Sequence, residues 1–253
     1  MATVTAFKTN SSAAPGPAPT SGIERRPFAS LGKADHGWLK ANHHFSFASY
    51  HDPRRMQWGA VRVWNDDQIA AQSGFPPHPH DNMEIITYVR EGAITHRDSM
   101  GNEGRTEAGD IQVMSAGTGV THSEANVDGE ETRLFQIWIM PRERNIAPRW
   151  DARPFPRGDR SGQFVTLASG DPADSDALYI NADAKLLCAT MEQGEIITHR
   201  IEEGRSAYLV PARGSLTING EAFDARDGAA IRGGTDLKIE ALSACEIVMV
   251  DSV

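Results

Sequence analysis

The fold of this chain is decided by the stretch Pro76-Pro77-His78-Pro79-His80-Asp81-Asn82-Met83-Glu84-Ile85-Ile86-Thr87-Tyr88-Val89. Proline fixes an extended backbone and is tolerated at the entry of a strand, where a missing backbone donor does little harm. The apolar run from Glu84 to Val89 is typical of a buried strand. The two histidines are therefore expected at the entrance of a β-sheet.

A second short segment, His122-Ser123-Glu124, completes the pattern. In an extended strand the side chains of residues i and i+2 lie on the same face. His78 and His80 can therefore point one way, and so can His122 and Glu124. If the two strands lie side by side, three imidazoles and one carboxylate converge. This mixed nitrogen and oxygen set is suited to Fe(II), Mn, Co, Ni or Zn.

The rest of the chain has the same texture of short β-rich runs separated by glycine, proline, asparagine and aspartate. Examples are residues 59–64, 110–114 and 134–139. Helical periodicity is weak, and only residues 66–72 are predicted to form a short helix. Many short strands with regular turn signals indicate an all-β sandwich or barrel.

The chain is predicted to contain two β-rich units. A stretch rich in proline and arginine, 141–160, separates the first series of strands from a second. We place the boundary near residue 150, with a first domain at 23–150 and a second at 151–253. Residues 1–22 are rich in Ala, Pro, Ser and Thr and are interpreted as a disordered N-terminal tail. The second series comprises the runs 162–168, 184–191, 195–201, 205–210, 215–218 and 237–250.

The two units are also similar to each other, because Tyr88 and Tyr208 each precede a glycine-marked turn at comparable spacing. Transferring the ligand positions onto the second unit gives no His-x-His pair. We therefore expect the metal in the first unit only. The corresponding positions hold Thr198 and Arg200 in one register, Arg200 and Glu202 in another, and Ala241 in place of His122.

Composition excludes several classes of function. Of 253 residues, 25 are Lys or Arg and 34 are Asp or Glu, a net charge of −9 that argues against a nucleic-acid partner. No apolar run is long enough to cross a membrane, and the N-terminus lacks the pattern of a secretory signal. Cys188 and Cys245 are expected to be free buried thiols in a reducing compartment. We expect a soluble cytoplasmic protein.

Other polar residues near these segments leave alternatives open. Glu84 has the same parity as the first two histidines, so it could replace Glu124 as a ligand or accept a hydrogen bond from a ligating imidazole. His96, beside Arg97-Asp98, is expected on the surface. His43-His44 could line a pocket mouth or belong to the first strand, and His199 is interpreted as structural.

The segment from Gly74 to Asn126 resembles the two motifs of the cupin superfamily, although Ser115 stands where cupins usually have proline. The resemblance sharpens to the pirins, and in particular to bacterial pirin-like proteins. The segments that carry it are His36-Gly37-Trp38-Leu39, Phe45-Ser46-Phe47-Ala48, His78-Pro79-His80-Asp81-Asn82-Met83-Glu84, Asp98-Ser99-Met100-Gly101-Asn102, Met114-Ser115-Ala116-Gly117-Thr118-Gly119 and Gln136-Ile137-Trp138-Ile139-Met140-Pro141.

This resemblance implies a fold of two tandem cupin barrels. It also implies that the metal is held by His78, His80, His122 and Glu124, with Glu84 outside the ligand set. Several pirins are similar to quercetin 2,3-dioxygenases, which open the flavonol ring with O2 and release carbon monoxide. The eukaryotic branch is instead associated with transcriptional co-regulation and redox sensing, so a metal-binding regulatory protein is the alternative function.

The predicted mechanism is a metal-dependent dioxygenation of a flavonol-like substrate. The metal, with Fe(II) as first candidate ahead of Mn, Co, Ni, Cu and Zn, acts as Lewis acid and template. Glu124, or Glu84 behind it, is the expected base for the substrate 3-hydroxyl. No nucleic-acid or membrane partner is expected, and a monomer is favoured. Candidate pocket walls are Phe75, Met83, Ile86, Tyr88 and Met114.

Overall fold

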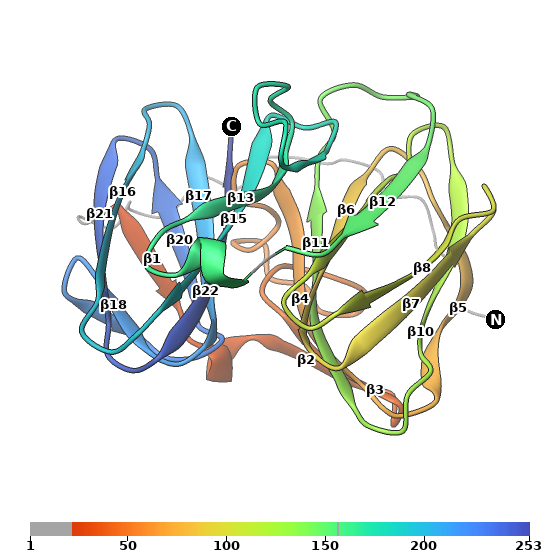
Figure 1. The fold of residues 1–253 in the computed structure, drawn as a ribbon, viewed down its shortest axis with the longest axis horizontal. Helices are drawn as coiled ribbons and strands as arrows, with labels where there is room; N and C mark the ends of the chain where they lie inside the picture. Colours follow the sequence, from red (N-terminus) through yellow and green to blue (C-terminus); the bar gives the residue numbers. More distant parts are fainter. Residues whose placement is uncertain (1–21, 156) are drawn as a thin grey trace.

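The computed structural model of the protein describes residues 22–155 and 157–253. Its strands form two units side by side (Figure 1), each made of a seven-stranded and a four-stranded sheet. Within these described residues the helical segments are short 3-10 helices, η1 (Phe28–Ser30) and η2 (Arg157–Arg160), and neither is long and apolar enough to span a membrane. The predicted all-β fold of two tandem barrels is confirmed. The predicted tail, 1–22, lies outside the described residues except for Gly22.

The first barrel encloses its interior between a large and a small sheet, and the chain passes repeatedly from one sheet to the other, as in a jelly roll. The large sheet contains, in spatial order, β12 (Arg149–Arg153), β9 (Ile111–Ser115), β6 (Glu84–Glu91), β11 (Thr132–Ile139), β4 (Val61–Ile69), β3 (Leu39–His43) and β2 (Gly32–Asp35). The small sheet contains β5 (Ser73–His80), β10 (Val120–Asn126), β7 (Ala93–Asp98) and β8 (Glu103–Glu107).

The second barrel repeats this plan. Its large sheet contains β1 (Ile23–Arg26), β20 (Gly228–Arg232), β17 (Ser206–Arg213), β22 (Cys245–Ser252), β15 (Ala184–Met191), β13 (Val165–Ser169) and β14 (Leu178–Tyr179). Its small sheet contains β16 (Ile196–Ile201), β21 (Thr235–Ala241), β18 (Leu216–Ile218) and β19 (Glu221–Phe223). Both cysteines are free and buried, as predicted.

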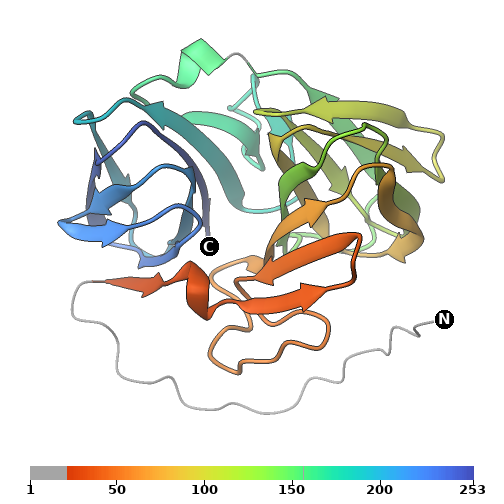
Figure 2. The same ribbon diagram turned by 90° about the horizontal axis from the view of Figure 1, so that it is seen from below.

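Two strands depart from the predicted division at residue 150. β1 precedes the first barrel in sequence but pairs with β20 of the second, with Ile23 opposite Ile231. Figure 2 shows this strand beside the second barrel before η1 leads the chain into the first. β12 pairs with β9 and so extends the large sheet of the first barrel past residue 150. β1, at the start of the predicted unit 23–150, therefore belongs to the second barrel. The part of β12 that lies in the predicted unit 151–253 belongs to the first barrel.

The predicted short helix at 66–72 is wrong, because most of this segment belongs to β4. β4 pairs with β3 on one side and β11 on the other, and these ladders override the weak local helix preference. Asp66 is buried and forms ion pairs with Arg90 and Arg226. The Asp66 carboxylate thus forms an ion pair between the two barrels, because Arg226 lies just before β20 of the second barrel.

The two large sheets pack against each other through one apolar cluster drawn from both barrels. Ile86 and Tyr88 belong to this shared core, and both are completely buried. The Tyr88 hydroxyl donates to Glu246 of the second barrel and also lies 3.5 Å from Cys188 Sγ. The prediction that Ile86 and Tyr88 line the substrate pocket is therefore wrong, because this face of β6 points toward the other barrel.

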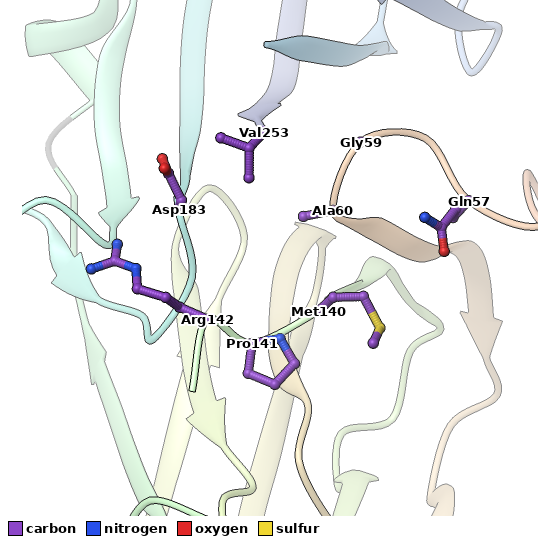
Figure 3. Close-up of a pocket in the computed structure, with 8 residues that line it drawn as sticks. All are labelled: Gln57, Gly59, Ala60, Met140, Pro141, Arg142, Asp183 and Val253. Carbon is purple, nitrogen blue, oxygen red and sulfur yellow. The ribbon is translucent and has the colours of Figure 1, made fainter. Parts of the chain in front are cut away.

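A pocket of about 430 Å³ opens at the junction of the two barrels (Figure 3). Its two charged side chains already have partners. Arg142 donates to the carbonyls of Gly170 and Ala182, and Asp183 accepts from Arg205. None of His78, His80 and His122 lines it. The lining residues are Gln57, Gly59, Ala60, Met140, Pro141, Arg142, Asp183 and Val253.

Candidate metal centre

The two metal-binding segments of the sequence form neighbouring antiparallel strands, β5 and β10, with His78 directly opposite His122. β5 lies at the edge of its sheet, where prolines are tolerated. A β-bulge places Pro76 and Pro77 opposite a single residue of β10, between the pairs His78–His122 and Phe75–Glu124. Bulges of this kind redirect side chains near functional sites.

The three histidines converge as predicted. Their ring centroids are 4.8 Å apart for His78 and His80, 4.5 Å for His78 and His122, and 5.0 Å for His80 and His122. One nitrogen of each lies within 4.8 Å of those of the other two, which brings all three within reach of a single ion. Among the described residues, this is the one such cluster found.

The state of the imidazoles fits metal binding. His78 Nδ1 lies 2.8 Å from the carbonyl of Pro76, which leaves Nε2 free for an ion. His122 Nε2 is buried and has no hydrogen-bond partner. Burial, reinforced by the charge of His78, lowers the pKa of His80 to about 4 and that of His122 to about 2. Both are thus neutral at physiological pH, the form that a ligating imidazole requires.

Glu124 lies one inward-facing position beyond His122 on β10 and is only 2% exposed. Its Oε1 accepts hydrogen bonds from Thr87 Oγ1 at 2.9 Å and from Gln112 Nε2 at 2.6 Å. Its Oε2 accepts from the side-chain amide of Gln136. The carboxylate is therefore held by three neutral donors, two positions beyond His122 on the same strand, whereas the group of ligand atoms within 4.8 Å of one another contains the three histidines alone.

Two further side chains fix which way these amides point. Trp138 Nε1 donates to Gln136 Oε1 at 3.2 Å, and Thr106 Oγ1 donates to Gln112 Oε1 at 3.2 Å. Each amide therefore turns its NH2 group toward the carboxylate. Sequence reasoning missed both glutamines, because they come from β9 and β11 in the opposite sheet and carry no local motif.

Glu84 does not share a face with the histidines of β5, which corrects the expectation from parity. Asn82 has a positive φ of 47°, and the chain turns there from the small sheet into the large one. Glu84 Oε2 accepts from Ser115 Oγ at 2.6 Å and from the backbone N–H of Asn181 at 3.0 Å. Burial raises the pKa of Glu84. The contact with Asn181 ties the two barrels together, and we assign Glu84 no part in proton transfer.

His96 is not on the surface, so that prediction is also wrong. It is 1% exposed, and its Nδ1 lies 3.4 Å from Nδ1 of His122. Its other nitrogen, Nε2, lies 3.1 Å from Asp98 Oδ2. The ring of Trp150 is stacked on it, with centroids 4.9 Å apart and planes inclined by 10°. The alternation of β7 could have predicted this, since residues 94, 96 and 98 share one face.

Aromatic and sulfur-containing side chains surround the entrance to the histidines. The ring of Trp138 lies 4.9 Å from His80 and 5.4 Å from Phe47, both in edge-to-face contact. Met83 and Met114 belong to the same apolar group as Trp138. Phe75 packs beside Trp38, at a centroid distance of 5.1 Å, and its ring also lies 6.2 Å from that of His78. Of the predicted pocket walls, Phe75, Met83 and Met114 thus lie near the histidines or the aromatic side chain beside them.

The other histidines have local partners. His43 ends β3 and hydrogen-bonds to Asn65 at 2.8 Å, while His44 lies 2.8 Å from the hydroxyl of Tyr208 in the contact between barrels. His199 packs edge-to-face on Phe164 in the second barrel. For His43 and His44, the structure therefore favours the alternative of a role in the first strand over one at a pocket mouth.

The positions in the second barrel that correspond to His78 and His80 do not face its interior. Thr198 and Arg200 are exposed, and Arg200 forms an ion pair with Asp236. The neighbouring residues of β16, Ile197 and Ile201, point inward instead. Ala241 is buried in this apolar core, as expected for a position without a ligand role.

Fold and site together define the class, a two-barrel cupin protein with three converging histidines in the first barrel. Residues 24–139 match the family described as pirin, and residues 166–252 match the quercetinase C-terminal cupin domain. The chain is 60% identical over 230 residues to a pirin-like protein of Caulobacter vibrioides, covering 91% of this chain and 99% of that protein. The chain belongs to the pirin family.

Two relatives from Escherichia coli are also informative. The chain is 42% identical over 221 residues to the quercetin 2,3-dioxygenase of strain K12, covering 87% of this chain and 94% of that one. It is similar in structure to the bacterial pirin YhhW solved in complex with nickel(II), with a TM-score of 0.85 and 41% identity. That match covers 91% of this chain and 98% of the other.

Proposed function

We propose that the first barrel binds one divalent transition metal through His78, His80 and His122, with Glu124 as the fourth ligand. The observation that carries this proposal is the convergence of three imidazoles, one of which presents a buried Nε2 without a partner. The position of Glu124 on the same inward face of β10 supports its assignment. Fe(II) is our first choice of metal, although the related E. coli pirin was solved with nickel(II).

We further propose that the protein is a dioxygenase of the quercetin 2,3-dioxygenase type, which opens a flavonol ring with O2 and releases carbon monoxide. The name of the E. coli relative supports this assignment. When bound, the metal would supply Lewis-acid activation and a common template for substrate and O2. Glu124 takes the proton of the substrate 3-hydroxyl, because it is the carboxylate nearest to the histidines along β10.

The surroundings of the site suit a flat aromatic substrate. His78 and His80 are only half-buried, so a ligand can reach them from solvent. Trp138 and Phe47 form an aromatic wall at this entrance and can pack on substrate rings. Gln112 and Gln136 hold the Glu124 carboxylate in place for proton transfer.

The test is a turnover assay on protein loaded without oxygen. Separate samples receive Fe(II), Mn(II), Co(II), Ni(II) or Cu(II), followed by quercetin and then air. We expect the flavonol absorbance to fall and carbon monoxide to be released in step with it. If no metal supports turnover of quercetin or of other flavonols, the dioxygenase proposal is wrong and a metal-binding regulatory role is favoured instead.

A further inference from the structure

A buried hydrogen-bonded chain extends from the candidate metal ligand His122 away from the ion-binding cluster. His96 Nδ1 lies 3.4 Å from His122 Nδ1, and His96 Nε2 lies 3.1 Å from Asp98 Oδ2. His96 is 1% exposed, and the Asp98 side chain is fully buried. Neither of these two hydrogen bonds is therefore exposed to water.

The order of donors along this chain follows from the chemistry of its two ends. The Asp98 carboxylate can only accept, so the neutral imidazole of His96 carries its single proton on Nε2. Nδ1 of His96 is then an acceptor, which requires the proton of neutral His122 to be on Nδ1. His122 Nε2 is left as a bare lone pair, and this is the buried nitrogen that has no partner.

Asp98 and His96 are themselves held rigidly. Asp98 Oδ1 accepts from the backbone N–H groups of Met100 and Asn102 at 2.9 and 3.0 Å, and Oδ2 accepts from the Asn102 side chain at 2.9 Å. Trp150 stacks on His96, and a Cβ added at Gly104 would lie 2.2 Å from its indole ring. Glycine at this position therefore leaves the room in which Trp150 covers the imidazole.

We infer that His96 and Asp98 are positioning residues that fix the tautomer and orientation of His122, so that its Nε2 is presented to the metal. A ligating histidine commonly donates its other N–H to an oriented acceptor, and loss of that acceptor lowers metal affinity. Here the acceptor is a second histidine, which a carboxylate orients in turn. This inference rests on the three-histidine metal site of the proposed function but not on its flavonol chemistry.

The first test replaces His96 with phenylalanine in the full-length protein. The variant His96→Phe keeps a ring for Trp150 to stack on but removes both nitrogens. We expect Co(II) affinity, measured by competition with a chelator, to fall about 10–100-fold. We also expect the visible absorption spectrum of bound Co(II) to change, because His122 is no longer held in one orientation.

The second variant, Asp98→Asn, keeps the shape of the hydrogen-bonded chain and reverses its direction. An amide NH2 facing His96 would favour the tautomer with an acceptor at Nε2 and a proton on Nδ1. That proton would then face the Nδ1 proton of His122. We expect a loss of Co(II) affinity in the same range as for His96→Phe. This variant keeps the inference testable if His96→Phe does not fold.

The matched control is His43→Gln, which removes another buried imidazole of the same barrel that bonds to Asn65 instead. We expect it to lower the melting temperature without changing the affinity or spectrum of Co(II). Wild-type affinity and spectrum in either folded variant, His96→Phe or Asp98→Asn, would overturn the inference. Wild-type protein that binds metal but does not turn over quercetin would overturn the dioxygenase proposal alone, whereas wild-type protein that binds no metal would overturn both.

Discussion

The two barrels share one arrangement of sheets but differ in what fills them. In the second barrel, inward-facing residues such as Leu237 and Ile239 belong to one continuous apolar cluster. In the first barrel the apolar residues form two smaller groups, one containing Leu134 and the other containing Met114. A polar layer around Glu124 separates them.

The strands of the first barrel show how this layer arises. Along β11, Leu134 belongs to the inner apolar group and Trp138 packs with the outer one, with Gln136 between them. Along β6, Thr87 stands in the same way between Ile85 and Val89. A single polar residue at the same level of neighbouring strands is thus enough to build a site within an otherwise apolar barrel.

The comparison teaches how the molecule combines chemistry with stability. Buried polar groups are costly unless they are hydrogen-bonded, and Thr87, Gln112 and Gln136 all meet this condition by donating to Glu124. Even so, these polar side chains contribute less to the free energy of folding than apolar side chains would at the same positions. The apolar burial that stabilises the fold comes instead from the second barrel and from the core shared by the two large sheets.

The largest effect is expected from removing a clustered histidine of the first barrel, compared with removing a histidine of the second. His80→Ala should reduce metal affinity at least about 100-fold, more than the loss of an outer contact, and should abolish turnover. His199→Ala, which removes a half-buried histidine of the second barrel, should leave both unchanged. For both variants, chelator competition measures the metal affinity and carbon monoxide release measures the turnover. Full metal affinity in His80→Ala would show that the cluster is not the metal site.

The next largest effect is expected from replacing the Glu124 carboxylate, which tests its role separately from that of the imidazoles. Glu124→Gln keeps the shape of the side chain but removes the base, so kcat should fall about 10²–10⁴-fold. The three imidazoles should still hold the metal. Turnover of quercetin and metal content are measured on the same samples, with the exposed Glu107→Gln as control. Unchanged kcat in Glu124→Gln would remove Glu124 from the mechanism.

The grouping of the three histidines is predictable from the sequence because the pattern that indicates it is local. His78 and His80 share a face by strand parity, and so do His122 and Glu124. The glycine-rich turn before His122 is also visible in the sequence. These features need no knowledge of which strands pair. The all-β class is predictable for the same reason, since alternation and turn residues are local signals.

The residues that surround the ligands could not be predicted in the same way. Gln112 and Gln136 reach Glu124 across the barrel, and His96 reaches His122 from the neighbouring strand, so each depends on strand register. Glu84 was misplaced because parity does not continue through the turn at Asn82. Long-range pairing therefore decides the environment of the site, while local pattern decides its ligands.

The difference in packing predicts where the free energy of unfolding is most sensitive. Leu237 is 1% exposed within the core of the second barrel. Leu237→Ala should lower the free energy of unfolding by about 2–5 kcal/mol, through lost burial and the cavity that remains. Urea denaturation measures this, with the exposed Leu242→Ala as control. Metal affinity should not change. A large loss of affinity would mean that metal binding in the first barrel depends on the packing of the second.

The smallest effect concerns a buried acid in the first barrel. Asp67 is 2% exposed, and within the described part of the chain its Oδ1 has no hydrogen-bond partner. Burial raises its pKa well above the usual 3.8, and the charges of Asp66 and Glu124 add to the shift. The folded state therefore holds this proton more tightly than the unfolded state does. By linkage, the contribution of Asp67 to stability is greatest below pH 3.8 and declines as the pH rises above it.

Asp67→Asn removes this dependence, because an amide does not titrate. We expect the variant to be more stable than the wild type by at least about 1 kcal/mol at about pH 7.5, since one pKa unit corresponds to about 1.4 kcal/mol. The gap should narrow as the pH falls toward about 4, where the unfolded state also begins to bind the proton. Urea denaturation of both proteins across this range measures it. A gap that stays constant with pH would mean that Asp67 is ionised in the folded barrel, and that the polar layer tolerates a second charge beside Glu124.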